Sequence, residues 1–314
     1  MKLAGRLVPL ALLLAVPAVA LPVFFSRAPV LVVTDVPFAA LYGEERIRGH
    51  RISASLSLFR PVRPVMIADD ASPDILIAAI SHASGNPFAV LFPRRFSAVA
   101  ERFHEEFPPV PAVVFRGTSA SGMPAGNGTL SVYGTDRRAD LFRAGILAGT
   151  IGLAGKTSGG EEDSGGRRTH VLLHDSLSTG EERAVFSGAV MEVDSASAVV
   201  FAGSSAAMPD LRLAASVVSA GGPGDFMERN VGVPVILFSW MHPDFTSGEV
   251  LVMFDDSHWA LAAEAARMAA RGEAEGLIPS KTLIFSDRIA DNGVARVLKR
   301  AAGRIPPKFD AGEH

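Results

Sequence analysis

The chain has 314 residues, of which 48% are hydrophobic and 20% are charged, and its formal net charge is −3. This composition is that of a globular protein with two domains, and it excludes both a disordered chain and a globally basic protein that binds nucleic acid. The lack of cysteine excludes disulfides, thiolate catalysis, cysteine-zinc sites and the lipid anchor of a lipoprotein.

The first residues have the pattern of an export signal. Lys2 and Arg6 precede an unbroken apolar run, Leu7 to Ala20, whose last three residues form an Ala-Val-Ala cleavage site. The apolar run continues to Phe25, so an uncleaved membrane anchor is the alternative. Residues 1–27 are therefore expected to be a signal peptide or an N-terminal anchor. The remainder is expected in the periplasm or another extracytoplasmic compartment.

Short β-rich runs then alternate with helical patterns. Strands are predicted within 29–35, 64–70, 88–93, 111–117, 130–134, 169–175, 197–203, 234–240, 249–256 and 281–287. Helices are predicted over 42–58, 73–83, 96–107, 180–193, 209–219, 257–271 and 292–302, and a small-residue helix follows the strand at 130–134. Segments 117–129 and 156–168 have the composition of loops. This alternation predicts an α/β protein whose parallel sheets carry helices on both faces.

Hydroxyl, carboxylate and aromatic side chains recur where the predicted strands end. They are Thr34-Asp35, Asp69-Asp70, His174-Asp175-Ser176, Ser239-Trp240 and Asp255-Asp256. Open α/β sheets bind ligands outside the carboxyl ends of their strands, and such side chains suit a small polar ligand. The alternative is that each Asp or Ser only caps the following helix.

Residues 132–149, VYGTDRRADLFRAGILAG, carry a family resemblance. They resemble the hinge segment of type I periplasmic substrate-binding proteins, the ribose-binding and LacI-like superfamily that includes the nucleoside-binding BMP group. Thr135-Asp136 and the segment 144–149, AGILAG, match the pattern of that hinge. Glu182-Arg183 and Gly188 resemble the next family segment, with one residue inserted before the glycine. The segments 233–240 and 250–276 resemble the later hinge strands and the helix that follows them.

The resemblance implies an α/β fold of two doubly wound parallel-sheet domains joined by a multi-strand hinge. The first domain is expected to comprise 28–135 and 250–275, and the second 136–249 and 276–305, with a tail at 306–314. The chain departs from the family where Ser239-Trp240 replaces the aspartate of many sugar binders. The segment 204–230 is irregular, so a diverged or non-binding member is left open.

The resemblance also implies a set of ligand-binding residues. They are Asp35, Phe38, Tyr42, Phe92, Arg94, Asp136, Ser176, Ser178, Arg183, Ser204, Trp240 and Asp255. Aromatic rings would stack on the ligand, carboxylates would accept hydrogen bonds from hydroxyls, and the guanidinium would donate several. Core packing is the alternative for Phe38 and Phe92, and an ion pair with Glu181 or Glu182 is the alternative for Arg183.

The function that the resemblance implies is capture of a sugar or nucleoside by hinge closure over an interdomain cleft. The monomeric protein would deliver this small-molecule ligand to a membrane ABC permease. No catalytic residue, cofactor, metal or nucleic-acid partner is expected, because the histidines lack a ligand spacing and no phosphate loop or nucleophile elbow is present. The alternatives are an exported α/β enzyme that uses strand-end carboxylates, and a ligand sensor of the same fold without a transport role.

Overall fold

Two compact units make up the chain, and each is described by itself. The first contains residues 1–134 and 258–278, and the second contains 135–257 and 279–314. The chain therefore passes between the units three times, after residues 134, 257 and 278. A computed structural model describes residues 21–68, 71–116, 130–158, 170–175, 178–202, 213–218, 233–238, 250–285, 296 and 299–300.

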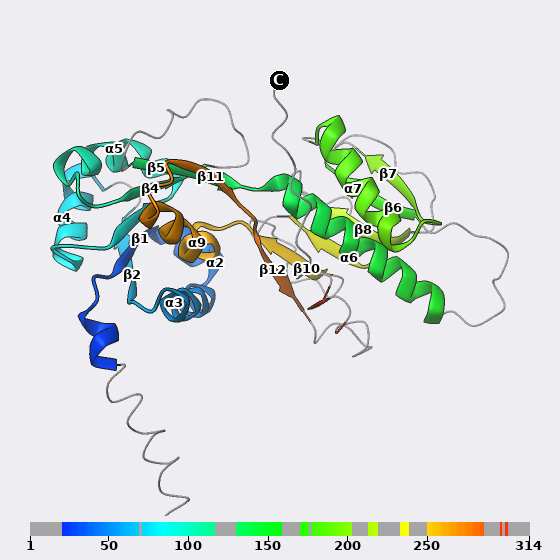
Figure 1. Ribbon diagram of the computed structural model, residues 1–314, viewed down its shortest axis with the longest axis horizontal. Helices are drawn as coiled ribbons and strands as arrows, with labels where there is room; N and C mark the ends of the chain where they lie inside the picture. Colours follow the sequence, from blue (N-terminus) through cyan, green and yellow to red (C-terminus); the bar gives the residue numbers. More distant parts are fainter. Residues whose placement is uncertain are drawn as a thin grey trace, which may run out of the picture. The chain divides into compact units, whose positions relative to one another are not determined.

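The first unit is built on a six-stranded sheet in the order β11-β5-β4-β3-β1-β2 (Figure 1). Its strands are β1 (Val30–Asp35), β2 (Val62–Ile67), β3 (Ala89–Phe92), β4 (Ala112–Phe115), β5 (Leu130–Thr135) and β11 (Glu275–Ile278). The strands β1 to β5 pair in parallel. β1 lies inside the sheet and all six of its residues are buried, which explains its continuous apolar run.

Helices cover both faces of this sheet. They are α2 (Val36–Tyr42), α3 (Glu44–Leu58), α4 (Pro73–Ala83), α5 (Ser97–Glu106) and α9 (His258–Ala270). Leu31 and Val33 of β1 join the core formed with α4 and α5. Thr34, whose side chain points to the other face, contacts α9. The expected helix over 42–58 begins at Glu44 as α3, and the shorter helix α2 precedes it. Gly43 separates the two helices with a φ of 95°.

The second unit repeats this strand order. Its six-stranded sheet runs β12-β10-β9-β8-β6-β7. The strands are β6 (His170–His174), β7 (Ala198–Ala202), β8 (Leu213–Val218), β9 (Val235–Leu237), β10 (Val250–Asp255) and β12 (Lys281–Ile284). The strands β6 to β10 pair in parallel, whereas β12 is antiparallel to β10. The α/β class and the two parallel-sheet domains are thus confirmed, with one antiparallel strand that the sequence patterns did not predict.

Two expectations about this unit need correction. The helix predicted over 209–219 is wrong for residues 213–218, which form β8 between β6 and β9. Pairing on both sides outweighs the helical propensity of its alanines and leucine. The strand Val250–Asp255, expected in the first domain, pairs with β9 and β12 and so lies in the second unit. Conversely, 276–278 belong to β11 of the first unit.

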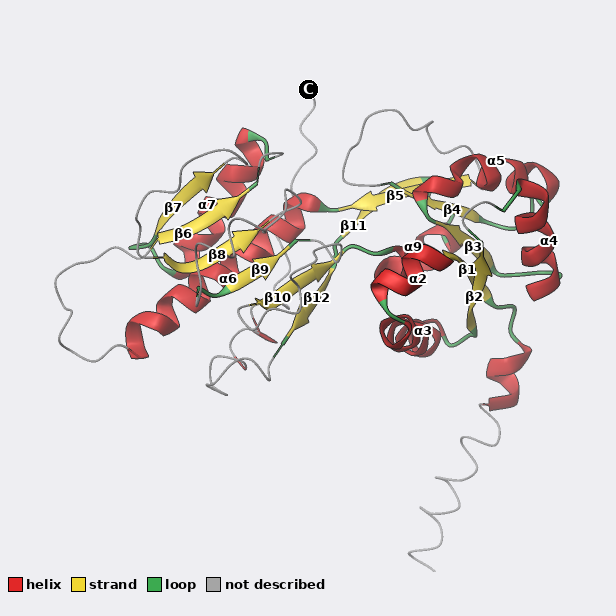
Figure 2. Ribbon diagram, turned by 180° about the vertical axis from the view of Figure 1, so that it is seen from behind, coloured by secondary structure: helices red, strands yellow, loops and turns green. Residues whose placement is uncertain are grey.

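A pair of helices packs on one face of the second sheet. They are α6 (Arg137–Ser158) and α7 (Gly180–Val193), which lie side by side (Figure 2). A Cβ atom on Gly145 would lie 2.6 Å from the backbone oxygen of Phe186, and one on Gly149 would lie 3.0 Å from that of Val190. The small residues of α6 therefore allow close approach to α7.

No helix within the described residues is both long enough and apolar enough to cross a membrane.

Candidate functional site

Asp35 ends β1 and is buried at the carboxyl edge of the first sheet. Its Oδ1 accepts a hydrogen bond of 2.6 Å from the backbone N–H of Phe38, which caps α2. The same oxygen lies 3.4 Å from a guanidinium nitrogen of Arg95. Asp35 thus performs the capping role that the sequence left open and also holds an arginine at this edge. Its ligand-binding role stays a prediction.

Two aromatic rings and two histidines gather next to Asp35. The Phe38 ring stacks on Tyr42 at 4.9 Å between centroids and lies 4.4 Å from the His258 ring. Tyr42 stacks in turn on His50 at 6.0 Å. Phe38 is half-buried, whereas the other three are buried. We call Asp35, Phe38, Tyr42 and His258 the Phe38 group. A partly exposed ring beside a carboxylate can stack on a cyclic polar ligand and bind its hydroxyls.

A buried hydrogen bond positions the start of α9 against β1. The indole Nε1–H of Trp259 donates to Oγ1 of Thr34 at 3.0 Å, and both side chains are buried. Thr34 precedes Asp35, and Trp259 follows His258. The bond therefore helps to fix the positions of Asp35 and His258, the two members of the Phe38 group that adjoin its partners.

The end of β3 differs from what the resemblance implied. Phe92 is fully buried and packs 5.8 Å from Phe103 in the core of the first unit. This is the packing role that was left open for it. Arg94 is exposed in the short 3-10 helix after β3, and the next residue, Arg95, is the one that reaches Asp35.

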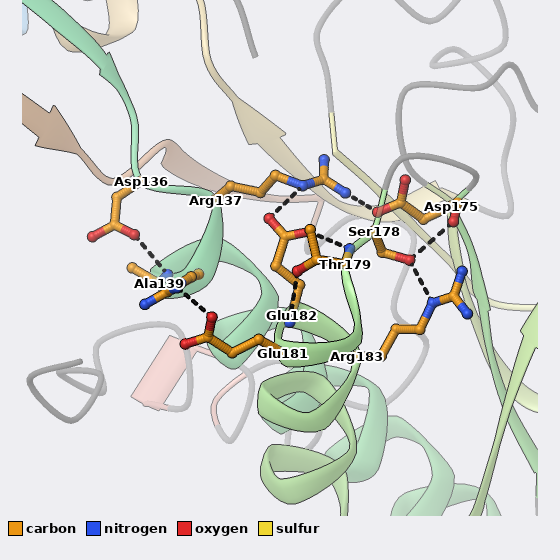
Figure 3. A network of polar contacts seen from close by, with 10 residues as sticks. Asp136, Arg137, Ala139, Asp175, Ser178, Thr179, Glu181, Glu182 and Arg183 are labelled. Carbon is orange, nitrogen blue, oxygen red and sulfur yellow. Dashed lines mark hydrogen bonds and ion pairs between the residues drawn. The ribbon is translucent and has the colours of Figure 1, made fainter. Parts of the chain in front are cut away.

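In the second unit, polar contacts join the start of α6 to the start of α7 (Figure 3). Oδ1 of Asp136 accepts a 2.9 Å hydrogen bond from the backbone N–H of Ala139, so Asp136 caps α6. The next residue, Arg137, donates through Nε to Glu182 at 3.0 Å and through Nη2 to the buried carboxylate of Asp175. The structure shows this capping role, and the ligand-binding role expected for Asp136 stays a prediction.

Ser178 and Arg183 contact each other beside this network. Nε of Arg183 donates to Oγ of Ser178 at 2.9 Å, and that hydroxyl donates to the backbone oxygen of Asp175 at 3.0 Å. The guanidinium also lies 5.4 Å from the centre of the Phe201 ring. Two predicted ligand-binding residues are thus brought together at the end of β6, with Arg183 held in place by a hydroxyl and a ring.

The glutamates beside Arg183 have other partners. Glu182 pairs with Arg137, and Glu181 pairs with Arg138. Glu182 also forms a capping box with Thr179: the N–H of Glu182 donates to Oγ1 of Thr179 at 3.2 Å, and the N–H of Thr179 donates to Oε2 of Glu182 at 2.9 Å. The glutamates therefore fix the start of α7, in place of the ion pair proposed as the alternative for Arg183.

The carboxyl ends of β6 and β10 carry a half-buried histidine and a buried aspartate. Burial lowers the pKa of His174 below its ordinary value, which favours the neutral imidazole. Asp255 is fully buried at the end of β10, where its Oδ1 accepts a 3.0 Å hydrogen bond from the N–H of Ser257. Asp255 therefore supports the turn before the chain leaves the second unit.

A second polar network is buried between α6 and β12. Asp140 accepts hydrogen bonds from the N–H of Ser280 at 3.0 Å and from its hydroxyl at 2.5 Å, and it pairs with Arg143. Arg143 also donates to the Ser280 carbonyl at 2.8 Å and to Oγ1 of Thr282 at 3.2 Å. Burial raises the pKa of Asp140 to about 6, although the arginine and the serine act to lower it.

Three predicted ligand-binding residues, Ser176, Ser204 and Trp240, lie outside the described residues. Within the part of the chain that is described, no group of histidine and acidic side chains could hold a metal ion.

Sequence reasoning missed three residues that organise these sites: Arg95, Arg137 and His258. Arg95 and Arg137 each directly follow a residue that was chosen, Arg94 and Asp136. Which of two adjacent residues reaches the edge of the sheet depends on the side of the helical turn that faces it. The spacing of residues along the sequence does not reveal that side. His258 had a local signal, since it begins the helix after the Asp255 strand.

Comparison with solved structures defines the class of fold. A transcriptional activator of the comK gene from Bacillus halodurans matches with a TM-score of 0.50 and 11% identity, over 88% of this chain and 96% of that one. The chain therefore shares the fold of that structure, and its two parallel-sheet units have the architecture that the resemblance implied.

Two solute-binding proteins are also similar to the chain. One, an ABC transporter solute-binding protein from Aeropyrum pernix K1, has a TM-score of 0.45 and 11% identity, over 90% of this chain and 95% of that one. The other, the arabinose-binding protein AraP from Geobacillus stearothermophilus, has a TM-score of 0.45 and 14% identity, over 83% of this chain and 98% of that one. No protein-family model and no curated protein matches the chain.

Proposed function

We propose that this protein is an exported binding protein that captures a small polar ligand, a sugar or a nucleoside, without converting it. The observation that carries the proposal is the Phe38 group. Its half-buried ring and the neighbouring carboxylate lie at the carboxyl edge of a parallel sheet, where this class of fold binds ligands. A stacked sugar or base would cover the exposed part of Phe38.

Arg183 and Ser178 are proposed as the contribution of the second unit. Arg183 is half-buried, fixed through Nε, and keeps further N–H donors on a planar guanidinium that suits hydroxyls or a carbonyl. The resemblance adds that the ligand is held in an interdomain cleft that closes by bending at the three crossings, and that the monomer delivers it to an ABC permease.

Ligand-dependent thermal stabilisation tests the proposal. A panel of pentoses, hexoses and nucleosides is added to the purified protein, and the sample is analysed for product. At a ligand concentration of about 100 times Kd, the ligand adds about 2.7 kcal/mol to the free energy of unfolding, which raises Tm by several degrees. If every member of the panel leaves Tm unchanged, or if a product forms, the binding-protein proposal fails.

A matched pair of variants in α2 tests the Phe38 group. Phe38→Leu removes the stacking surface but keeps an apolar side chain, and it is expected to weaken binding about tenfold. Leu41→Ala changes a residue of the same helix that is 78% exposed, and it is expected to leave Kd unchanged. Isothermal titration of both variants with the ligand from the panel measures the difference. Equal Kd values would remove Phe38 from the site.

A ligand sensor without a transport role is the second candidate. The observation that favours it is the likeness to a structure described as a transcriptional activator. Both candidates bind ligand, so uptake separates them. Cells that lack the protein lose uptake of the radiolabelled ligand if it serves a permease, and keep it if it acts only as a sensor.

A further inference from the structure

Two large apolar side chains are exposed on the outward side of α3, among arginines, serines and a glycine. Ile47, His50 and Ala54 are the buried residues of this helix, and they face the rest of the first unit. On the other side, Ile52 is 51% exposed and Leu56, one turn later, is 72% exposed. An apolar pair so fully exposed on a solvated helix is unexplained by the packing of the unit itself.

The segment before β1 carries further exposed apolar side chains and packs against the end of α3. Residues 21–26 are helical, and the Phe24 ring contacts the Phe59 ring at the end of α3 edge-to-face at 5.9 Å. Leu21 and Phe25 are 53% and 65% exposed. Figure 1 shows the dark blue helical segment and α3 at the β2 edge of the first sheet. We call Leu21, Val23, Phe25, Ile52, Leu56 and Phe59 the α3 face.

Arginines surround the α3 face. The Arg27 guanidinium lies 5.0 Å from the centre of the Phe59 ring, and Nη1 donates to the Phe59 carbonyl at 3.4 Å. Arg48 and Arg51 are exposed on α3. A second cation lies nearby, because Nη1 of Arg60 donates to the carbonyl of Ala28, the residue after Arg27, at 3.1 Å. Burial and the neighbouring charge of Arg27 lower the pKa of Arg60. The acidic residues of α3, Glu44 and Glu45, lie in its first turn, away from Phe59.

The chain itself indicates what covers this surface. The apolar run Leu7–Ala20 directly precedes residue 21, so the most apolar part of the sequence joins the unit at the α3 face. Exposed aromatic and aliphatic side chains with arginines at their border are the combination that binds the interface of an anionic bilayer. A soluble partner would not explain why this surface coincides with the junction to the apolar run.

We propose that the α3 face rests on an anionic lipid surface, with Ile52, Leu56 and Phe25 at the level of the acyl chains and Arg27, Arg48 and Arg51 at the phosphates. The first unit is thereby held against the membrane by its β2 edge. The opposite edge of the sheet, formed by β11, faces away from the lipid.

Site-specific fluorescence in the full chain tests this proposal. Because the chain has no cysteine, Leu56→Cys provides a single site for an environment-sensitive dye. The matched control is Leu277→Cys, since Leu277 is 61% exposed and lies on the opposite edge strand, β11. Both labelled proteins are reconstituted into vesicles of phosphatidylcholine with phosphatidylglycerol, with and without nitroxide-labelled lipid.

The expected result is a blue shift and strong nitroxide quenching of the dye at position 56, with neither effect at position 277. Arg48→Glu with Arg51→Glu is expected to weaken the position-56 signal, by about fivefold per arginine removed, and added salt is expected to act in the same direction. Equal quenching at positions 56 and 277 overturns the proposal. So does a shift at position 56 that depends on protein concentration without lipid, because it would mean that a second copy of the chain covers the face.

Discussion

Asp140 and Ser280 are joined by two hydrogen bonds across 140 residues of sequence: the Ser280 N–H donates to Oδ1 at 3.0 Å, and its hydroxyl donates to Oδ2 at 2.5 Å. Asp140 lies in α6, soon after the first passage of the chain between the units, and Ser280 follows the third passage. The pair therefore fastens two of the three connecting segments to one another inside the second unit.

Asp140 is expected to make stability depend on pH. Burial raises its pKa from 3.8 to about 6, so the folded protein holds this proton more tightly than the unfolded chain does. Its contribution to the free energy of unfolding is therefore fully present below about pH 4 and falls by about 3 kcal/mol as the pH rises to about 6. Denaturant unfolding of the wild type and Asp140→Asn across this range measures the contribution.

The difference between the two proteins is the quantity to follow, because other carboxyl groups titrate in both. In Asp140→Asn, the free energy of unfolding lacks the part of its pH dependence that comes from position 140. The same difference at every pH would mean that the pKa of Asp140 is not raised in the folded state.

Two neighbouring arginines are expected to differ in their effect on stability. Arg137→Met leaves the carboxylate of Asp175, whose side chain is 1% exposed, without its guanidinium partner, and is expected to cost about 3 kcal/mol or more. Arg138→Met breaks a pair with Glu181 in which the side chains are 36% and 58% exposed, and is expected to cost less than about 1 kcal/mol. Urea unfolding of both variants measures the contrast, and similar losses would count against the role of Arg137.

Two glycines of the helix pair are expected to respond to alanine in opposite directions. A Cβ at position 145 would lie 2.6 Å from the backbone oxygen of Phe186, so Gly145→Ala must push α7 away and is expected to cost about 1–3 kcal/mol. At Gly188, in α7, a Cβ meets nothing within 4 Å, so Gly188→Ala is expected to stabilise by about 0.5–1 kcal/mol. Thermal melts give both signs, and a gain of stability in Gly145→Ala would contradict the close packing.

The buried bond between Trp259 and Thr34 is expected to contribute to the stability of the first unit. Trp259→Phe removes the N–H donor, leaves the Thr34 hydroxyl without it and opens space, and is expected to cost about 2–4 kcal/mol. Thr34→Val keeps the shape but leaves the indole N–H without an acceptor, with an expected cost of about 1–3 kcal/mol. The double variant is expected to cost less than the sum of the two. Strict additivity in denaturant unfolding would show that the bond contributes nothing.

The local patterns predicted most of the strands and the helices that follow them. The apolar runs of β1, β3, β4 and β10 are continuous because both faces of each strand are covered, and such runs are recognisable in one sequence. The helix predicted over 209–219 failed because residues 213–218 take their state from two neighbouring strands rather than from their own propensity. The unit to which residues 250–257 belong was likewise decided by pairing with β9 and β12.

The same division holds for the candidate sites. Local patterns place Asp35, Phe38 and Tyr42 after a buried strand, and Ser178 and Arg183 after another, because strand ends and helix starts are local features. The folded arrangement is needed to show that Phe92 is core, that Arg95 rather than Arg94 reaches Asp35, and that Asp140 meets Ser280. These outcomes depend on burial and on contacts between segments far apart in the chain, and side-chain spacing along one segment carries no information about either.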